Sequence, residues 1–166
     1  MQIGRMSKEL ETKQLNFGKL FKQKSFIQFF NSRQEINTLF SLLSIEEINQ
    51  LVELNVIFVR CCAPSSKVNL EGITVNGNLT LVTVDTNYYS KLLPEEFVGV
   101  LLHEIGHVFN PERQNMEGEY VADNFAKQKG YDKWIISGLQ KGVKNNWMGF
   151  DEQSCNLRIE KLRETK

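Results

Sequence analysis

Long apolar runs are missing from this sequence of 166 residues. Its best apolar stretches, Val56–Val59 and Val98–Leu102, fall far short of the roughly 18 residues that a membrane-spanning helix needs. The first residues, MQIGRMSKELETKQ, are polar and charged, without the apolar core of a secretory signal. We therefore expect no membrane insertion and a cytoplasmic location.

An excess of one charge sign is also missing. Lys and Arg together number 20, Asp and Glu number 20, and the formal net charge is zero. A neutral balance gives no electrostatic reason to expect nucleic acid or an anionic membrane as the main partner. The composition leaves the oligomeric state open.

Cysteine is scarce, with three residues, of which Cys61 and Cys62 are adjacent. An odd count with this spacing does not suit a disulfide framework and favours a reducing compartment. The simplest interpretation of all three is structural. Cys155 could in principle also be a thiolate ligand or an inhibitory thiol.

Helical periodicity dominates the first third of the chain. Residues 1–24 are polar with weak periodicity, which predicts a loosely held segment and leaves a helix open as an option. Residues 25–54 predict helices, because apolar residues recur at steps of three and four. Ser44 and Glu47 form a capping-box pattern at a predicted helix start. We assign residues 1–54 to an N-terminal helical segment packed on the remainder, residues 55–166.

The period changes after residue 55. Short strands are predicted at Val56–Arg60, Gly72–Val75 and Leu79–Val84. Asn76-Gly77-Asn78 predicts a hairpin between the last two, because Asn and Gly accept positive φ.

From residue 94 the sequence predicts helices again. Pro94 suits a first helical position, and Pro111 ends that helix by biasing Asn110 out of it. Further helices are predicted at about 117–129, 131–143 and 152–164. Helices, then a small sheet, then helices indicate the α+β class.

Histidine is the scarcest chemistry-bearing residue, and both copies fall in one motif, His103-Glu104-Ile105-Gly106-His107. Residues four apart lie on the same side of a helix, so two imidazoles can share one ion. Glu104 is offset by about 100° and can reach water at that ion without being a ligand. Two randomly placed histidines would give this motif in about one chain in a thousand.

A catalytic zinc site takes three protein ligands and leaves one position open. In the metzincin pattern the third ligand would be His at 113, after Gly at 110. This chain has Asn110 and Arg113, which excludes that class. The third ligand must be a carboxylate or a thiolate elsewhere.

Glu119 is the natural candidate for the third ligand. It shares a helical face with Asp123, beside the small residues Ala122 and Ala126, which would let two helices approach closely. The acidic residues Glu112, Glu117 and Asp123 remain competitors.

The pattern His103–His107 followed by Glu119-x-x-Ala-Asp123 resembles the gluzincin metallopeptidases. It is most similar to the family of HtpX and the CAAX prenyl protease, with its soluble relatives, the minigluzincins. The resemblance implies that Glu119 is the third zinc ligand and that Asp123 hydrogen-bonds the first histidine. It also implies one Zn²⁺ per chain and Glu104 as general base.

The resemblance extends from about Thr80 to Leu162, and Arg158-Ile159 matches the closing R-I pair of the family. The membrane helices of the larger relatives are missing, and Glu152-Gln153 stands where His-Pro often occurs. The gap between His107 and Glu119 is short. ImmA-type proteins, which cleave phage repressors, share a similar short arrangement.

The function implied is that of a zinc-dependent endopeptidase acting on a peptide or protein. The alternatives are a highly specific regulatory protease of the ImmA type and a non-proteolytic zinc-binding regulatory protein. The implied fold for residues 55–166 is a compact zincin-like domain, with a small mixed sheet over the active-site helix and C-terminal helices.

Two further assignments concern catalysis and substrate. No third histidine is present to stabilise the oxyanion, so we consider Arg158 first and Tyr131 second as donors. Arg158 could instead hold the Asp and Glu carboxylates in place. The strand Leu79–Val84 is either an ordinary sheet strand or one that pairs with extended substrate. In the second case the substrate-binding residues would be Leu79, Leu81 and Thr83.

Overall fold

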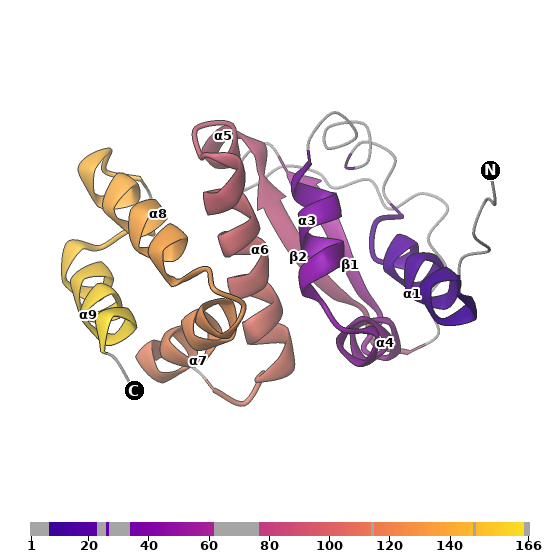
Figure 1. Cartoon of the computed structure of the whole chain (residues 1–166). Coiled ribbons are helices and arrows are strands. Elements are labelled where there is room, and N and C mark those ends of the chain that lie inside the picture. The colour runs from indigo at the N-terminus through magenta and orange to yellow at the C-terminus, as the bar shows by residue number, and fades with distance from the viewer. Residues whose placement is uncertain are drawn as a thin grey trace. The chain divides into compact units, whose positions relative to one another are not determined.

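The computed structural model describes residues 7–22, 26, 34–61, 77–113, 115–147 and 149–164. The chain divides into two compact units, Met1–Ser90 and Lys91–Lys166. Their helices and strands can be followed in Figure 1. Within the described residues, no helix is both long and apolar enough to cross a bilayer. The structure is α+β and mostly helical, as expected, while the predicted division at residue 54 stays a prediction.

The first unit combines helices with a pair of strands. Its elements are α1 (Lys8–Lys19), α3 (Glu35–Leu42), α4 (Ile45–Glu53), β1 (Val56–Cys61), β2 (Thr80–Asp85) and α5 (Thr86–Tyr89). The capping box predicted at Ser44 is confirmed: its hydroxyl accepts from the Glu47 amide, and the Glu47 carboxylate accepts from the Ser44 amide.

Helix α1 shows that Lys8–Lys19 takes the helical form allowed by the sequence, and it corrects the expectation that this part is loosely held. Ser7 caps it by accepting from the Leu10 amide, and Phe17 is buried. Phe21 follows α1 and stacks on Phe58 of β1 at 5.0 Å between ring centroids. An aromatic contact therefore holds this segment in place, although the segment is polar on average.

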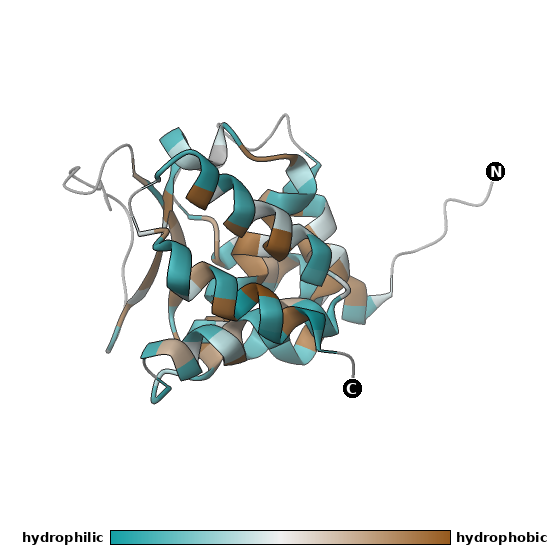
Figure 2. Ribbon diagram, turned by 90° about the vertical axis from the view of Figure 1, so that its left-hand side faces the viewer, coloured by the Kyte–Doolittle hydropathy of each residue, from teal (hydrophilic) through white to brown (hydrophobic). Residues whose placement is uncertain are grey.

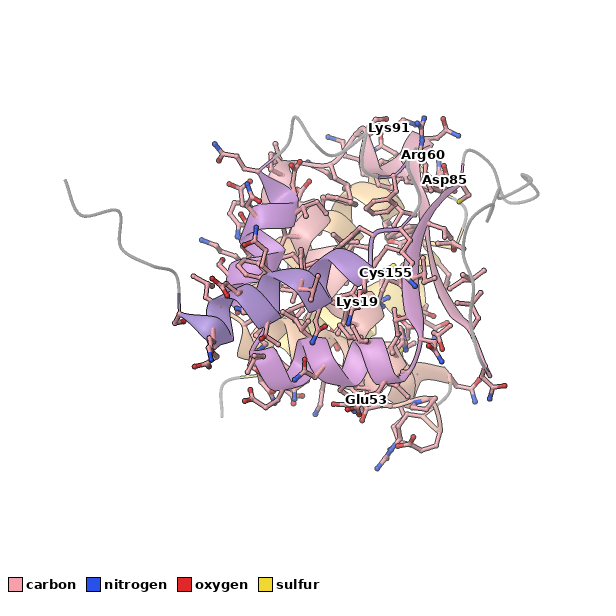
Figure 3. The ribbon with its side chains drawn as sticks, turned by 90° about the vertical axis from the view of Figure 1, so that its right-hand side faces the viewer. Lys19, Glu53, Arg60, Asp85, Lys91 and Cys155 are labelled. Carbon is pink, nitrogen blue, oxygen red and sulfur yellow. The ribbon has the colours of Figure 1, made fainter. Side chains whose placement is uncertain are left out.

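The strands β1 and β2 pair in parallel, with Val56 opposite Thr80 and Cys61 opposite Asp85. Figure 3 shows Arg60 and Asp85 at the same end of the pair. Val82 and Val84 of β2 are buried, whereas Leu81 and Thr83 are exposed, which is the alternation of a half-covered strand. The predicted strand Gly72–Val75 lies outside the described residues. Gly77 of the predicted turn has a positive φ of 95°.

The second unit consists of helices in its described part. These are α6 (Pro94–Phe109), α7 (Asn115–Gln128), α8 (Asp132–Lys144) and α9 (Glu152–Arg163). The predicted helices are confirmed, with Pro94 at the start of α6 and Asn110 as its C-cap. In Figure 2 the helical ribbons change between teal and brown within single turns, as amphipathic helices do.

A buried carboxylate ties α6 to α8. Glu96 is fully buried and accepts hydrogen bonds from the Leu93 amide at 2.7 Å, Ser137 Oγ at 2.6 Å and Lys141 Nζ at 2.6 Å. Burial by itself would raise the pKa of Glu96, but these donors outweigh it and the pKa lies below its ordinary value. The start of α6 is therefore held by a charge that is satisfied inside the unit.

Candidate metal centre

Both histidines lie in the last two turns of α6, where α7 approaches unusually closely. A Cβ added to Gly106 would lie 2.7 Å from the backbone Cα of Ala122, so only glycine fits at this crossing. The close approach brings Glu119 and Asp123 of α7 against the imidazoles of α6. The small residues noted in the sequence therefore determine how near the two helices come.

Three donor side chains converge there. His103 Nε2 lies 3.1 Å from His107 Nε2 and 3.5 Å from Glu119 Oε2, and His107 Nε2 lies 3.3 Å from Glu119 Oε1. Ligand atoms bound tetrahedrally to zinc at roughly 2.0–2.1 Å stand about 3.3 Å apart. The donor set and its spacing therefore fit a metal ion such as Zn²⁺, and these residues form a group that could hold one.

The orientation of His103 is set from behind by Asp123. The buried Asp123 Oδ1 lies 2.8 Å from His103 Nδ1. An ionised carboxylate only accepts, so in a neutral His103 this contact favours the tautomer with the proton on Nδ1 and the Nε2 lone pair toward the donor group. This is the usual carboxylate support of a metal-binding imidazole.

Arg158 of α9 connects the two carboxylates. Its Nε and Nη2 donate to both oxygens of Asp123 at 2.8 and 2.7 Å, and its Nη1 lies 2.6 Å from Glu119 Oε2. The planar fork of arginine suits such two-point binding of a carboxylate. The guanidinium nitrogens are thus all engaged with residues that surround the imidazoles.

The pKa values follow from these contacts. Burial would raise the pKa of Asp123, but hydrogen bonds from His103 and Arg158 outweigh it and hold the pKa below its ordinary value. The pKa of Glu119 is lowered as well, since the hydrogen bond from His107 and the charge of Arg158 outweigh burial. The Glu119 hydrogen bond raises the pKa of His107. Both carboxylates are therefore anionic at neutral pH, as metal binding requires.

Glu104 lies beside the donor group without belonging to it. It is half-buried on α6, and its negative charge contributes to raising the pKa of His107. This position corresponds to the expected offset from the two histidines. Its role as general base stays a prediction.

The competing ligands lie outside the donor group in the described part of the chain. Asp123 supports His103 from the opposite nitrogen, and Glu117 pairs with Arg113. Cys155, labelled in Figure 3, is buried in α9, and burial raises the pKa of its thiol. A protonated, buried thiol fits the structural interpretation of this cysteine.

Tyr131 is not brought to the donor group. It precedes α8 as its N-cap, and its pKa is raised by burial and by the nearby charge of Glu95. Glu95 lies eight residues before His103 on α6, a rise of about 12 Å along the helix. The role of Tyr131 as oxyanion donor stays a prediction. The substrate-pairing role of Leu79, Leu81 and Thr83 stays a prediction.

A cavity of about 620 Å³ opens beside the donor group. Its described lining comes from α6, the loop before α7, α7 itself, the loop before α9 and α9: His107, Arg113, Asn115, Met116, Glu119, Gly149, Ser154, Cys155 and Arg158. The sequence interpretation missed Arg113, using it only to exclude a third histidine. The sequence did contain a sign that Arg113 lies near the site. In the metzincin pattern a histidine at this position reaches the metal.

No protein-family model, curated protein or solved structure matches this chain.

Proposed function

We propose that the chain is a zinc-dependent endopeptidase of the gluzincin type, with one Zn²⁺ held by His103, His107 and Glu119. The observation that carries this proposal is the spacing of the three donors, 3.1 to 3.5 Å, which fits the edges of a zinc-centred tetrahedron. Three protein ligands leave one position for water or substrate, which distinguishes a catalytic from a closed structural site.

Zn²⁺ bound there would supply a Lewis acid that activates water at neutral pH and polarises the scissile carbonyl. Glu104 accepts the proton of the attacking water on its carboxylate and passes it to the leaving amine. Asp123 keeps the proton of His103 on Nδ1 throughout, so that Nε2 remains a ligand.

For Arg158, the contacts support the second of its two expected roles. A guanidinium engaged with Asp123 and Glu119 at 2.6 to 2.8 Å orients both carboxylates and balances their charge. Arg158 then acts on the reaction through the ligand Glu119 and through His103. We assign it as a positioning residue and leave the oxyanion donor unassigned.

The test compares the wild type with Glu104→Gln on an unstructured substrate such as casein, both at full zinc occupancy. An amide cannot accept the proton, so we expect hydrolysis to fall by about 10²–10⁴-fold with zinc content unchanged. Near-normal turnover by Glu104→Gln would refute the mechanism. Zinc binding without hydrolysis of casein by the wild type would favour an ImmA-type specific protease or a zinc-binding regulator.

A further inference from the structure

The cavity beside the donor group has more basic than acidic side chains in its described lining. Its described lining contains two arginines, Arg113 and Arg158, and a single carboxylate, Glu119, which belongs to the donor group. Arg158 is engaged by Asp123 and Glu119. This leaves Arg113 as the cation that a bound substrate would meet in the cavity.

The backbone of Arg113 is held firmly at this place. Its amide donates to the Asn110 carbonyl at 3.1 Å, and Asn110 in turn donates from its side chain to the Gly106 carbonyl. A Cβ added to Gly118 would lie 2.6 Å from the Arg113 carbonyl oxygen and 3.8 Å from the His107 ring. Because Gly118 has no side chain, the backbone of Arg113 can lie close to α7, next to His107, a ligand of the proposed metal.

The side chain of Arg113 retains donors for a ligand. Its Nη1 pairs with Glu117 and its Nε lies 4.0 Å from Glu112 Oε1, and neither glutamate belongs to the cavity lining. An arginine has five N–H donors in a fixed fork, so these two ion pairs do not exhaust it. The guanidinium is about half exposed, with a side-chain exposure of 48%, and can turn toward an incoming anion.

We propose that this cavity takes a carboxylate of the substrate next to the scissile bond, with Arg113 as the specificity-determining residue. The proposal rests on the proposed peptidase function. The carboxylate can come from an acidic side chain, which defines an endopeptidase preference, or from a chain terminus, which defines an exopeptidase one. Both present the same planar anion to the guanidinium.

The first experiment measures kcat/KM for peptides that differ at one residue beside the cleaved bond. Glu is compared with its uncharged isostere Gln and with Lys, both within a long peptide and as the terminal residue. We expect the carboxylate to be preferred over Gln by about tenfold, as a partly exposed charge-assisted hydrogen bond allows. The position that shows the preference identifies the source of the carboxylate.

Variants then assign the preference to Arg113. Arg113→Gln should abolish it, Arg113→Lys should retain part of it, and Glu117→Gln should increase it by removing one of the two carboxylates that compete for Arg113. The matched control is Arg163→Gln, which removes an exposed arginine outside the cavity lining and should leave the ratio unchanged. A ratio that is equal for Glu and Gln in the wild type, or unaffected in Arg113→Gln, would overturn the proposal.

A binding measurement separates this inference from the peptidase function. Two peptide hydroxamates that carry Glu or Gln beside the zinc-binding group are titrated calorimetrically into the zinc-loaded protein. Tighter binding of the Glu compound, lost in Arg113→Gln, supports the pocket even when no peptide is hydrolysed, in which case only the proposed function fails. Equal affinities, or binding of neither compound, would overturn the pocket.

Discussion

The two units of this protein differ in how many polar and charged side chains their described parts bury. In Met1–Ser90 the described core is mostly apolar and rich in phenylalanine, with Phe17, Phe21, Phe26 and Phe58 in ring contact, and Glu35 is the charged residue buried there. In Lys91–Lys166 the buried residues include Glu96, His103 and Asp123, alongside an apolar core. An aromatic core needs no partners for its stability, whereas each buried charge needs donors or counter-charges nearby.

This difference indicates where chemistry resides. The charge of Glu96 is satisfied by structural donors that fix α6 to α8. That of Asp123 is satisfied by His103 and Arg158, two groups that also lie against Glu119, the candidate third ligand. The second unit therefore buries charge for two reasons. Glu96 holds two helices together, and Asp123 orients residues of the candidate metal centre.

The largest effect is expected from adding a side chain where α6 and α7 cross. Gly106→Ala would place a methyl group 2.7 Å from the Ala122 backbone, which cannot move as a flexible side chain would. We expect the free energy of unfolding to fall by about 3 kcal/mol, with weaker zinc binding as α7 is displaced.

Gly138→Ala is the matched control for that variant. An added Cβ at Gly138 of α8 meets nothing within 4 Å, so alanine should instead stabilise the helix by about 0.5–1 kcal/mol. Chemical denaturation with zinc titration measures both effects. Equal stability of the two variants would contradict the close crossing of α6 and α7.

A second prediction concerns how the free energy of unfolding depends on pH. Because the pKa of Glu96 is lowered below 4.5 by folding, its contribution to stability is present above that pH and is lost as pH falls through the lowered pKa. Glu96→Gln should reduce stability at pH 7 by about 2 kcal/mol and reduce the acid-induced loss of stability.

Phe58→Leu supplies the contrast from the first unit. This fully buried ring has no titratable group, so its loss should lower stability by about 1–2 kcal/mol equally at every pH. Denaturant titrations between pH 3 and 8 would compare the two slopes. Parallel slopes for wild type and Glu96→Gln would show that the buried carboxylate does not set the acid sensitivity.

A smaller effect is expected at the metal-supporting carboxylate. Asp123→Asn keeps the shape but loses the charge that Arg158 and His103 share, so zinc affinity should weaken by about 10–100-fold without being abolished. Competition with a zinc chelator measures the change. Unaltered affinity would mean that the contact between Asp123 and His103 does not support the metal.

The sequence predicted the helices of the second unit because their ends carry local signals. Pro94 begins α6, Asn110 and Pro111 end it, and Gly130, with a φ of 81°, follows α7. The contact between Glu96 and Lys141 had no such signal, since it joins residues 45 positions apart. Long-range pairing depends on how helices pack, which periodicity does not encode.

For the candidate site, the motif located the donors and the resemblance suggested their roles. The four-residue step fixed His103 and His107 on one helical face, but the approach of Glu119 required α7 to cross at Gly106. The role of Tyr131 stays a prediction, because adjacency to Gly130 does not determine which end of α6 this tyrosine lies near. In the first unit, the parallel pairing of β1 with β2 was not predictable from two short apolar runs.

The most direct test of the central claim is the zinc content of the purified protein, measured by elemental analysis beside His103→Ala and Glu119→Ala. The account predicts one zinc per wild-type chain, removable by a chelator, and strongly reduced zinc in both variants that retain the fold. Wild-type protein that binds no zinc when the metal is supplied in excess would contradict the proposed metal centre and the function built on it.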